Sequence, residues 1–168
     1  MTRLLSETIV RDLGHEDWPR VAAIFEEGIR TGNATFETEA PSWEAWDATH
    51  AESRLVAECD DELAGWAAVS PISDRRCYHG VAEVSVYVAE SFRGRGVGRA
   101  LLDELVVRSE AAGIWTLQAG IFPENKPSVR LHLGCGFRLV GVREGLGRRD
   151  GVWRDVLLLE RRSRVVGV

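Results

Sequence analysis

Apolar residues in the first fifty positions recur at two spacings, which predict a strand followed by two helices. Residues 8–13 (TIVRDL) are typical of a short strand. Beyond Asp17 the apolar residues lie three or four positions apart, the spacing of one face of a helix, which Gly32 would end. These residues are Trp18, Val21, Ala22, Phe25 and Ile29. A polar stretch follows, and Pro41-Ser42 is expected to begin a second, shorter helix.

The middle of the chain alternates between strand-like segments and turns. Residues 54–59 and 63–70 predict two strands joined by the acidic turn 60–62 (DDE). Residues 71–80 predict a loop. The next segment, 81–89, alternates valines with other side chains, so it predicts a strand whose two faces differ.

The last part of the chain predicts two helices that alternate with strands. Leucines and a valine gather on one side of a helix predicted over 96–112. A strand over 115–122 and a helix over 125–135 come next. Two final strands, 137–142 and 152–159, are expected to pair across a loop rich in glycine and arginine. This order predicts an α/β, or α+β, domain in which helices pack on a mixed sheet.

Length and composition favour a single soluble globular domain. The chain has 168 residues, of which 45% are hydrophobic and 28% are charged. The formal net charge of -5 argues against nucleic acid as the main partner, because binding phosphates requires a concentrated basic surface. No run approaches the ~20 apolar residues of a membrane span, and residues 1–12 lack the apolar segment of a signal peptide. The cysteines at 59, 77 and 135 show no metal-ligand spacing, so we expect a cytoplasmic protein with reduced thiols, no metal and no membrane partner.

A glycine-rich loop lies between the strand predicted at 81–89 and the helix that follows it. It consists of Arg93, Gly94, Arg95, Gly96, Val97, Gly98 and Arg99. Alternating glycines bring backbone N–H groups close to a ligand, and a helix N-terminus attracts anions. The loop therefore predicts a phosphate-binding site. It lacks the Gly-Lys-Ser/Thr of a Walker loop, and an arginine stands where a dinucleotide fingerprint has its third glycine.

Two motifs in the second half resemble the signatures of the GNAT (Gcn5-related) N-acetyltransferases. Arg93-x-x-Gly96-x-Gly98 is similar to the first signature of that family, R/Q-x-x-G-x-G/A. Asn125-x-x-Ser128-x-x-Leu131-His132-x-x-x-Gly136-Phe137 is similar to the second, with histidine in place of the usual tyrosine. The resemblance implies a GNAT fold, which has a mostly antiparallel, twisted sheet flanked by helices and split between its fourth and fifth strands. It also implies one domain over 1–168, with a core at about 7–161 and a tail at 162–168.

The same resemblance implies acetyl-CoA as cosubstrate and names the residues that would hold it. The pantetheine arm would lie between the strands at 83–89 and 116–122, hydrogen-bonded like an extra strand. The implied cofactor-binding residues are Val86, Tyr87, Val88, Arg93, Gly94, Arg95, Gly96, Val97, Gly98, Arg99, Asn125 and Ser128.

Two residues are candidates for the proton transfers that acetylation of an amine requires. Glu83 lies on the strand that leads into the glycine loop, where a carboxylate can take the proton of the attacking amine. His132 shares a helix face with Asn125 and Ser128. The family pattern places at His132 the residue that protonates the leaving thiolate. Each also has a structural alternative, a salt-bridged strand residue for Glu83 and a helix hydrogen-bonding residue for His132.

Several local segments resemble the phosphinothricin and methionine sulfoximine N-acetyltransferases within that family. The segments are 33–42, 71–78, 83–88, 127–132 and 151–156. The implied acceptor is the α-amino group of a small amino acid or of a glutamate-like analogue. Arg75 is expected to hold its carboxylate, and the other implied acceptor residues are Phe36, Glu37, Tyr78 and Trp153. Ile72-Ser73-Asp74 departs from the aromatic and basic residues of those enzymes, and the resemblance further implies a homodimer.

Three alternatives stay open at this stage. A protein or peptide N-terminal acetyltransferase would need an open acceptor groove, whereas Phe36-Glu37 favours a covered small-molecule site. A non-catalytic acyl-CoA-binding domain would keep the glycine loop, but the presence of both Glu83 and His132 argues against it. A nucleotide-phosphate-binding protein would need a lysine and a metal-binding carboxylate beside the loop.

Overall fold

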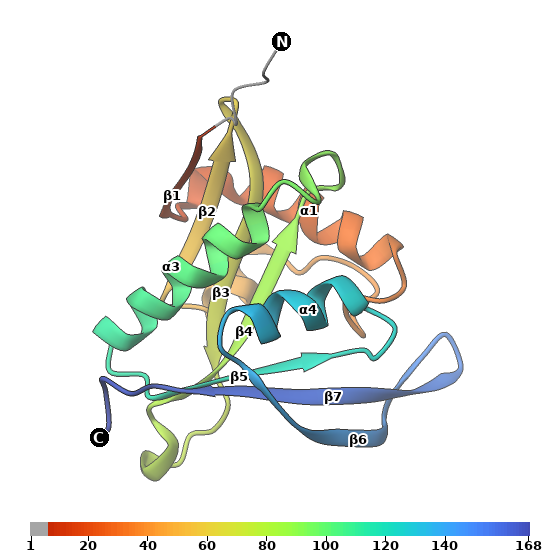
Figure 1. The fold of residues 1–168 in the computed structure, drawn as a ribbon. Coiled ribbons are helices and arrows are strands. Elements are labelled where there is room, and N and C mark those ends of the chain that lie inside the picture. The colour runs from red at the N-terminus through yellow and green to blue at the C-terminus, as the bar shows by residue number, and fades with distance from the viewer. Residues whose placement is uncertain (1–6) are drawn as a thin grey trace.

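The structure, a computed structural model, describes residues 7–168 and contains a seven-stranded sheet in the order β1-β2-β3-β4-β5-β7-β6 (Figure 1). Residues 1–6, which the one-domain prediction includes, lie outside the described range. The strands are β1 (Thr8–Asp12), β2 (Arg54–Cys59), β3 (Glu62–Pro71), β4 (Val81–Val88), β5 (Thr116–Ile121), β6 (Arg138–Arg149) and β7 (Val152–Arg162). The helices are α1 (Trp18–Arg30), α2 (Trp43–Asp47), α3 (Val97–Ala111) and α4 (Lys126–Gly134). Short 3-10 turns are η1 (His15–Asp17), η2 (Arg76–Tyr78) and η3 (Glu90–Phe92).

The sheet is antiparallel throughout except where β4 meets β5. These two parallel strands pair at Val81, Ala82 and Glu83 of β4, and the pairing ends there. Beyond Glu83 the strands diverge, which gives the sheet a split next to the last five residues of β4. The mixed fold and the split between the fourth and fifth strands are as predicted.

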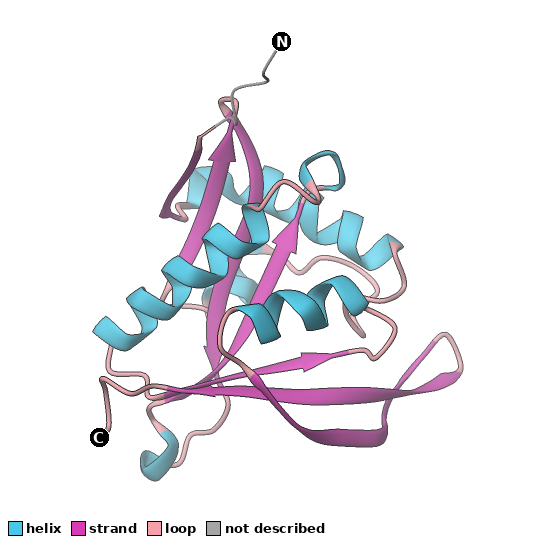
Figure 2. Ribbon diagram, in the orientation of Figure 1, coloured by secondary structure: helices cyan, strands magenta, loops and turns pink. Residues whose placement is uncertain are grey.

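The two faces of the sheet are covered by different helices. In Figure 1, α3 and α4 lie in front of the sheet, and α1 lies behind it. Leu101, Leu102 and Leu105 of α3 are fully buried, which confirms the apolar face predicted for this helix. Because helices cover both faces, β3 is buried along most of its length and contributes Trp66 to the core. Figure 2 shows the resulting three layers.

The β6–β7 hairpin is longer than the sequence pattern predicted. The segment expected to be a loop between 142 and 152 is β-strand as far as Arg149, and β7 continues to Arg162. Asp150 and Gly151 make the turn with positive φ angles of 49° and 79°. Two consecutive positive φ values are those of a type I′ turn, which matches the twist of a two-residue hairpin. The predicted loop at 143–151 was therefore wrong, because glycine and arginine composition outweighed the Asp-Gly turn signal.

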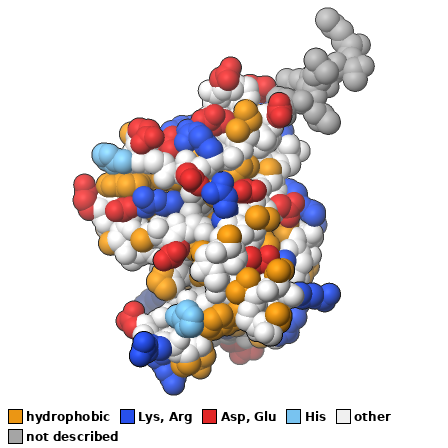
Figure 3. Space-filling model, turned by 90° about the vertical axis from the view of Figure 1, so that its left-hand side faces the viewer, with side chains coloured by type: hydrophobic (Ala, Val, Ile, Leu, Met, Phe, Trp, Pro, Cys, Tyr) orange, Lys and Arg blue, Asp and Glu red, His pale blue; other side chains and the backbone are white. Residues whose placement is uncertain are grey.

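Charged side chains on the surface are mostly interleaved by sign. Figure 3 shows basic and acidic groups side by side over much of one face. Ion pairs of this kind include Arg99 with Asp103 and Arg108 with Glu104. Within residues 7–168, no helix is both long and apolar enough to cross a membrane.

Candidate active site

A groove opens where β4 and β5 separate, and its volume is about 740 Å³. It runs from the glycine-rich loop, past the second half of β4, to the N-terminal end of α4. The predicted cofactor residues that line it are Val86, Tyr87, Val88, Arg93, Gly94, Gly96, Val97, Gly98, Arg99, Asn125 and Ser128. Arg130, which the sequence analysis did not single out, lines it as well.

The glycine-rich loop has the backbone geometry of a helix N-terminal anion site. Gly96 is the N-cap of α3 and has a φ of 85°, a value that favours glycine. A methyl group at this position would meet no atom within 4 Å, so the constraint comes from the backbone and not from crowding. The N–H groups of the first turn of α3 have no partner within the helix, and they lie at its positive end.

Two of the three arginines of this loop line the groove, and the third points elsewhere. Arg93 and Arg99 line it, although Arg99 also pairs with Asp103. Arg95 is not among the lining residues; its guanidinium reaches Asp60 at 2.8 Å in the β2–β3 turn and lies over the ring of Phe92. The structure thus brings eleven of the twelve predicted cofactor residues to the groove and directs Arg95 elsewhere.

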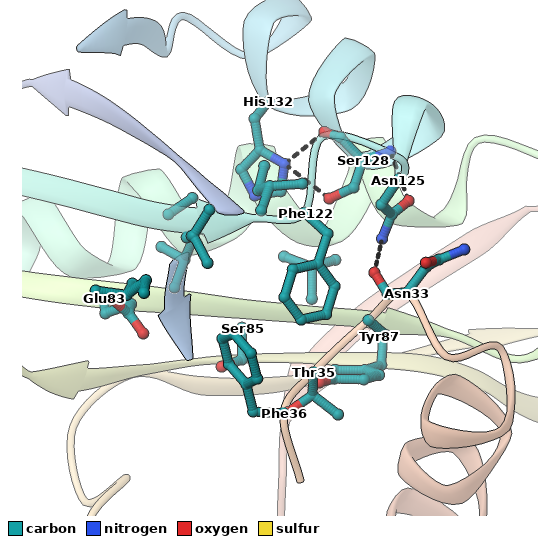
Figure 4. Close-up of a pocket in the computed structure, with 18 of the residues that line it drawn as sticks. Asn33, Thr35, Phe36, Glu83, Ser85, Tyr87, Phe122, Asn125, Ser128 and His132 are labelled. Atoms are coloured by element: carbon teal, nitrogen blue, oxygen red, sulfur yellow. Dashed lines mark hydrogen bonds between the residues drawn. The ribbon is translucent and has the colours of Figure 1, made fainter. Parts of the chain in front are cut away.

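A second, smaller cavity of about 360 Å³ adjoins the groove (Figure 4). Six residues line both spaces, namely Asn33, Ala34, Val86, Tyr87, Asn125 and Ser128. Glu83, Ser85 and Tyr87 follow one another on one face of β4 and all line the cavity. Burial raises the pKa of Tyr87 to about 12, and a hydrogen bond with Thr35 opposes this. The phenol therefore stays protonated at neutral pH.

Glu83 lies at the point where the sheet splits. It is the last residue of β4 that pairs with β5, and its partner in the register is Gln118. The side-chain amide of Gln118 donates to Oε2 of Glu83 at 3.0 Å. This bond leaves the other carboxylate oxygen of a half-buried group beside the cavity. Gln118 holds the carboxylate in place, a role that the sequence analysis missed because only the parallel pairing brings the two residues together.

His132 reaches the same cavity from α4. Its side chain is buried, and Nδ1 donates to the backbone carbonyl oxygen of Ser128 at 2.7 Å. Because that oxygen can only accept, the neutral ring carries its proton on Nδ1 and a lone pair on Nε2. Burial lowers the pKa of His132 below its usual range, and the bond to Ser128 opposes this only in part. At neutral pH the ring is thus uncharged and accepts a proton before it can donate one from Nε2.

Two arginines of the β6–β7 hairpin hold the α1–α2 loop, residues 31–42, which forms one wall of the cavity. Arg149 donates to the carbonyl oxygens of Thr35 and, at 2.8 Å, Ile29. Arg154 donates to the carbonyl oxygen of Gly32 at 3.0 Å and to Oδ1 of Asn33 at 2.9 Å. Both guanidinium groups are largely buried. Sequence reasoning missed them because their partners lie more than a hundred residues away.

The β6–β7 hairpin also contacts Phe36, the aromatic residue of the α1–α2 loop. A methyl group on Gly147 would lie 2.6 Å from the ring of Phe36, so glycine permits the close approach. Phe36 also packs edge-on against Phe122, with 4.8 Å between ring centroids. Both rings line the cavity, and Asn125 donates to the carbonyl oxygen of Asn33 at 3.1 Å beside them (Figure 4).

The other predicted acceptor residues are not among those that line the cavity. Arg75 and Tyr78 lie at η2, both exposed, with the guanidinium 5.2 Å above the phenol ring. Glu37 is exposed on the α1–α2 loop, and Trp153 is 65% exposed at the start of β7. Of the five residues predicted for the acceptor, the structure brings Phe36 to the cavity. The roles of all five remain predictions.

Comparison with models of known protein families assigns this chain to a family. The model of the Acetyltransferase (GNAT) family matches residues 17–137, which include the glycine-rich loop, Glu83 and His132. The chain belongs to the GNAT acetyltransferase family. The GNAT match confirms the resemblance drawn from the two sequence signatures.

Within the GNAT family, the chain is similar to acetyltransferases of two named kinds. The chain is 36% identical over 165 residues to phosphinothricin N-acetyltransferase of Alcaligenes faecalis, covering 91% of this chain and 80% of that protein. It is 30% identical over 160 residues to the L-methionine sulfoximine/L-methionine sulfone acetyltransferase of Pseudomonas aeruginosa, covering 90% and 92%. Both alignments span about nine tenths of this chain.

Solved structures of GNAT proteins superpose closely on this fold. The phosphinothricin acetyltransferase of Sinorhizobium meliloti in complex with AcCoA gives a TM-score of 0.85 at 30% identity, over 92% of this chain and 88% of that one. A ribosomal-protein-alanine N-acetyltransferase of Brucella melitensis gives 0.84 at 29% identity, over 92% and 99%. The fold alone therefore accommodates both small-molecule and protein acceptors.

Proposed function

We propose that this protein transfers the acetyl group of acetyl-CoA to the α-amino group of a small amino acid or of a glutamate or methionine analogue. Phosphinothricin, methionine sulfoximine and methionine sulfone represent the analogue class. The observation that carries the proposal is that a long groove beside a helix N-terminus meets a smaller cavity, with Glu83 and His132 both at the cavity. The relatives with phosphinothricin and methionine sulfoximine in their names support the acceptor class.

The groove fits acetyl-CoA in shape and in the chemistry of its lining. The N–H groups at the start of α3, with Arg93 and Arg99, suit the pyrophosphate. The backbone of β4 beyond Glu83, which β5 leaves unpaired, suits the amides of the pantetheine arm. Acetyl-CoA, when bound, supplies an activated acetyl thioester.

Glu83 is the residue that we assign to deprotonating the acceptor amine. An α-amino group has a pKa of about 7.7–8.0, so much of it is protonated at neutral pH and cannot attack. A carboxylate fixed by Gln118 can receive the proton directly or through water. The bond from Gln118 also keeps the carboxylate oriented without neutralising it.

His132 is the residue that we assign to the second proton transfer. Its neutral resting form presents a lone pair at Nε2, because Nδ1–H is bonded to Ser128. It therefore first gains a proton released at the amine nitrogen and then donates it to the departing thiolate. Burial assists the second step, since the charged imidazolium is disfavoured in this position.

A protein or peptide N-terminus is the competing acceptor, and the Brucella structure favours it. Against it stand the enclosing walls of the cavity. The α1–α2 loop is tied to the hairpin by Arg149 and Arg154, and Phe36 packs between Gly147 of that hairpin and Phe122. A cavity of about 360 Å³ suits a small amino acid better than an extended chain. We further propose a cytoplasmic homodimer as the working form.

The test is a substrate panel with acetyl-CoA in which the released thiol is followed. Phosphinothricin, methionine sulfoximine and methionine sulfone are compared with their decarboxylated amines and with an N-terminal alanine peptide. Higher kcat/KM for the amino acids supports the proposal, and Glu83→Gln serves as the inactive control. Turnover of the peptide alone would assign the protein to the competing class.

A further inference from the structure

The acceptor cavity contains one cationic side chain that the sequence analysis did not identify. Arg143 of β6 lines the cavity, whereas Arg75, the residue predicted to hold the acceptor carboxylate, does not. The only other titratable groups in the lining are Glu83, the buried His132 and the protonated Tyr87. A zwitterionic acceptor in this space thus has one carboxylate near its ammonium and one guanidinium for its anionic group.

The position of Arg143 on the sheet directs it toward the cavity. Its register partner on β7 is Val156, which is buried and also lines the cavity. Side chains of directly paired residues in an antiparallel ladder lie on the same face, so Arg143 projects from the cavity face of the hairpin. The register shifts between Arg143 and Gly147, which ends regular pairing directly after Arg143.

Arg143 differs from every other arginine of the hairpin in having no partner. Within residues 7–168 it makes no hydrogen bond, ion pair or ring contact. The others are occupied as follows: Arg138 by Glu160, Arg148 by the Gly151 carbonyl, Arg149 and Arg154 by the α1–α2 loop, Arg161 by Glu110, and Arg162 by backbone carbonyls. A guanidinium that lines a cavity and has all its N–H groups available is suited to bind a planar or tetrahedral anion through two bonds.

From this arrangement we infer that Arg143 binds an anionic group of the acceptor and so determines specificity for amino-acid acceptors. The inference rests on the proposed function and adds the residue that recognises the substrate. Two groups share the required chemistry, the α-carboxylate and the phosphinate of a phosphinothricin-type side chain. Phosphinothricin carries both, whereas methionine sulfone carries the carboxylate and a neutral sulfone.

The experiment compares the unmutated protein with Arg143→Ala, Arg143→Lys and Arg75→Ala. Each is assayed with phosphinothricin, methionine sulfone and the decarboxylated amine of methionine sulfone, and Tm is measured for each variant. We expect Arg143→Ala to raise the KM of an anionic acceptor on the order of tenfold. Loss of a charge-assisted hydrogen bond weakens binding, and solvent at the cavity mouth screens the charges and so reduces the loss. Lysine restores part of the loss, and the KM of acetyl-CoA and of the decarboxylated amine stays within about twofold.

The pattern across acceptors identifies the group that is bound. An equal loss with both amino acids assigns Arg143 to the α-carboxylate, and a loss confined to phosphinothricin assigns it to the phosphinate. Unchanged acceptor KM in Arg143→Ala, or an equal loss with the decarboxylated amine, overturns the inference while leaving the proposed function intact. An unmutated protein that acetylates none of the amino acids overturns both.

Discussion

Replacing Arg154 by methionine tests whether the hairpin holds the wall of the acceptor cavity. The substitution keeps an apolar stem against Phe122 and removes the guanidinium, which lies 4.1 Å from the centre of that ring. It also removes the bonds to the Gly32 carbonyl and to Asn33, at 3.0 and 2.9 Å. Hydrogen bonds from a charged donor contribute about 1.5–3 kcal/mol each, and their losses overlap because both hold one loop. We expect a loss of about 2–4 kcal/mol in the free energy of unfolding.

This loss is measurable in two ways. For a domain of this size, 1 kcal/mol shifts Tm by about 2–4 °C, so Arg154→Met should melt on the order of 5–10 °C lower. The loop contributes Asn33 and Phe36 to the cavity, so the acceptor KM should rise more than the acetyl-CoA KM. Arg148→Met is the matched control, because Arg148 lies on the same hairpin and bonds to the Gly151 carbonyl instead of the loop.

The reasoning fails if Arg154→Met melts within 1 °C of the control, a shift worth less than about 0.5 kcal/mol, and keeps its acceptor KM. That result would mean that Arg149 and the Phe36 contacts hold the loop without help. A fall in Tm with both KM values unchanged would restrict Arg154 to a structural role.

Four further outcomes are expected. Glu83→Gln should keep acetyl-CoA binding, checked by calorimetry, but lower kcat by roughly 10²–10⁴ at pH 7, with a smaller defect at high pH where free amine accumulates. His132→Phe should slow turnover. The pKa of His132 in the folded protein is below the unfolded value of 6.5, so the unmutated protein loses stability as the pH drops below 6.5. Over the same drop in pH, the Tm of His132→Phe should fall less than that of the unmutated protein. Gly96→Ala should cost about 1 kcal/mol, seen as a lower Tm, and weaken binding of acetyl-CoA, because φ there is 85°. Val142→Glu, on the edge strand β6 where Val142 is 53% exposed, should convert the proposed dimer to a monomer in light scattering.

The spacing of apolar residues along the sequence was sufficient to predict the elements that have one buried and one exposed face. The apolar faces of α1 and α3 have the predicted spacing, and the acidic pair Asp60-Asp61 makes the predicted β2–β3 turn with positive φ at both residues. The same reasoning did not predict the full length of the C-terminal hairpin, because its outer strand, β6, is mostly exposed and its apolar and polar residues do not alternate regularly. Its Asp150-Gly151 turn was the one local signal that predicts pairing over the full length.

The site was predictable where motif residues lie on regular elements, and less so where loops are placed by distant contacts. Glu83 on β4 and His132 on α4 do reach one cavity, as their predicted roles require. Arg75 belongs to a loop whose path depends on tertiary packing, and it lies outside that cavity. Gln118 and Arg143 enter only through strand pairing with β4 and β7, which no spacing in the sequence reveals.

The early end of the β4–β5 ladder gives this protein an edge in the interior of its sheet. Strand edges ordinarily lie at the margins, where charge, short length or a covering segment keeps other chains from adding to them. Here a row of backbone groups next to Val86 and Val88 is available in the middle, and any extended molecule with amides at the right repeat can complete the ladder. Recognition by this row depends on backbone-like chemistry and not on side-chain identity. In the proposed function, the pantetheine arm of acetyl-CoA would fill this place as an eighth strand inside the sheet, and its departure would leave the interior edge open again.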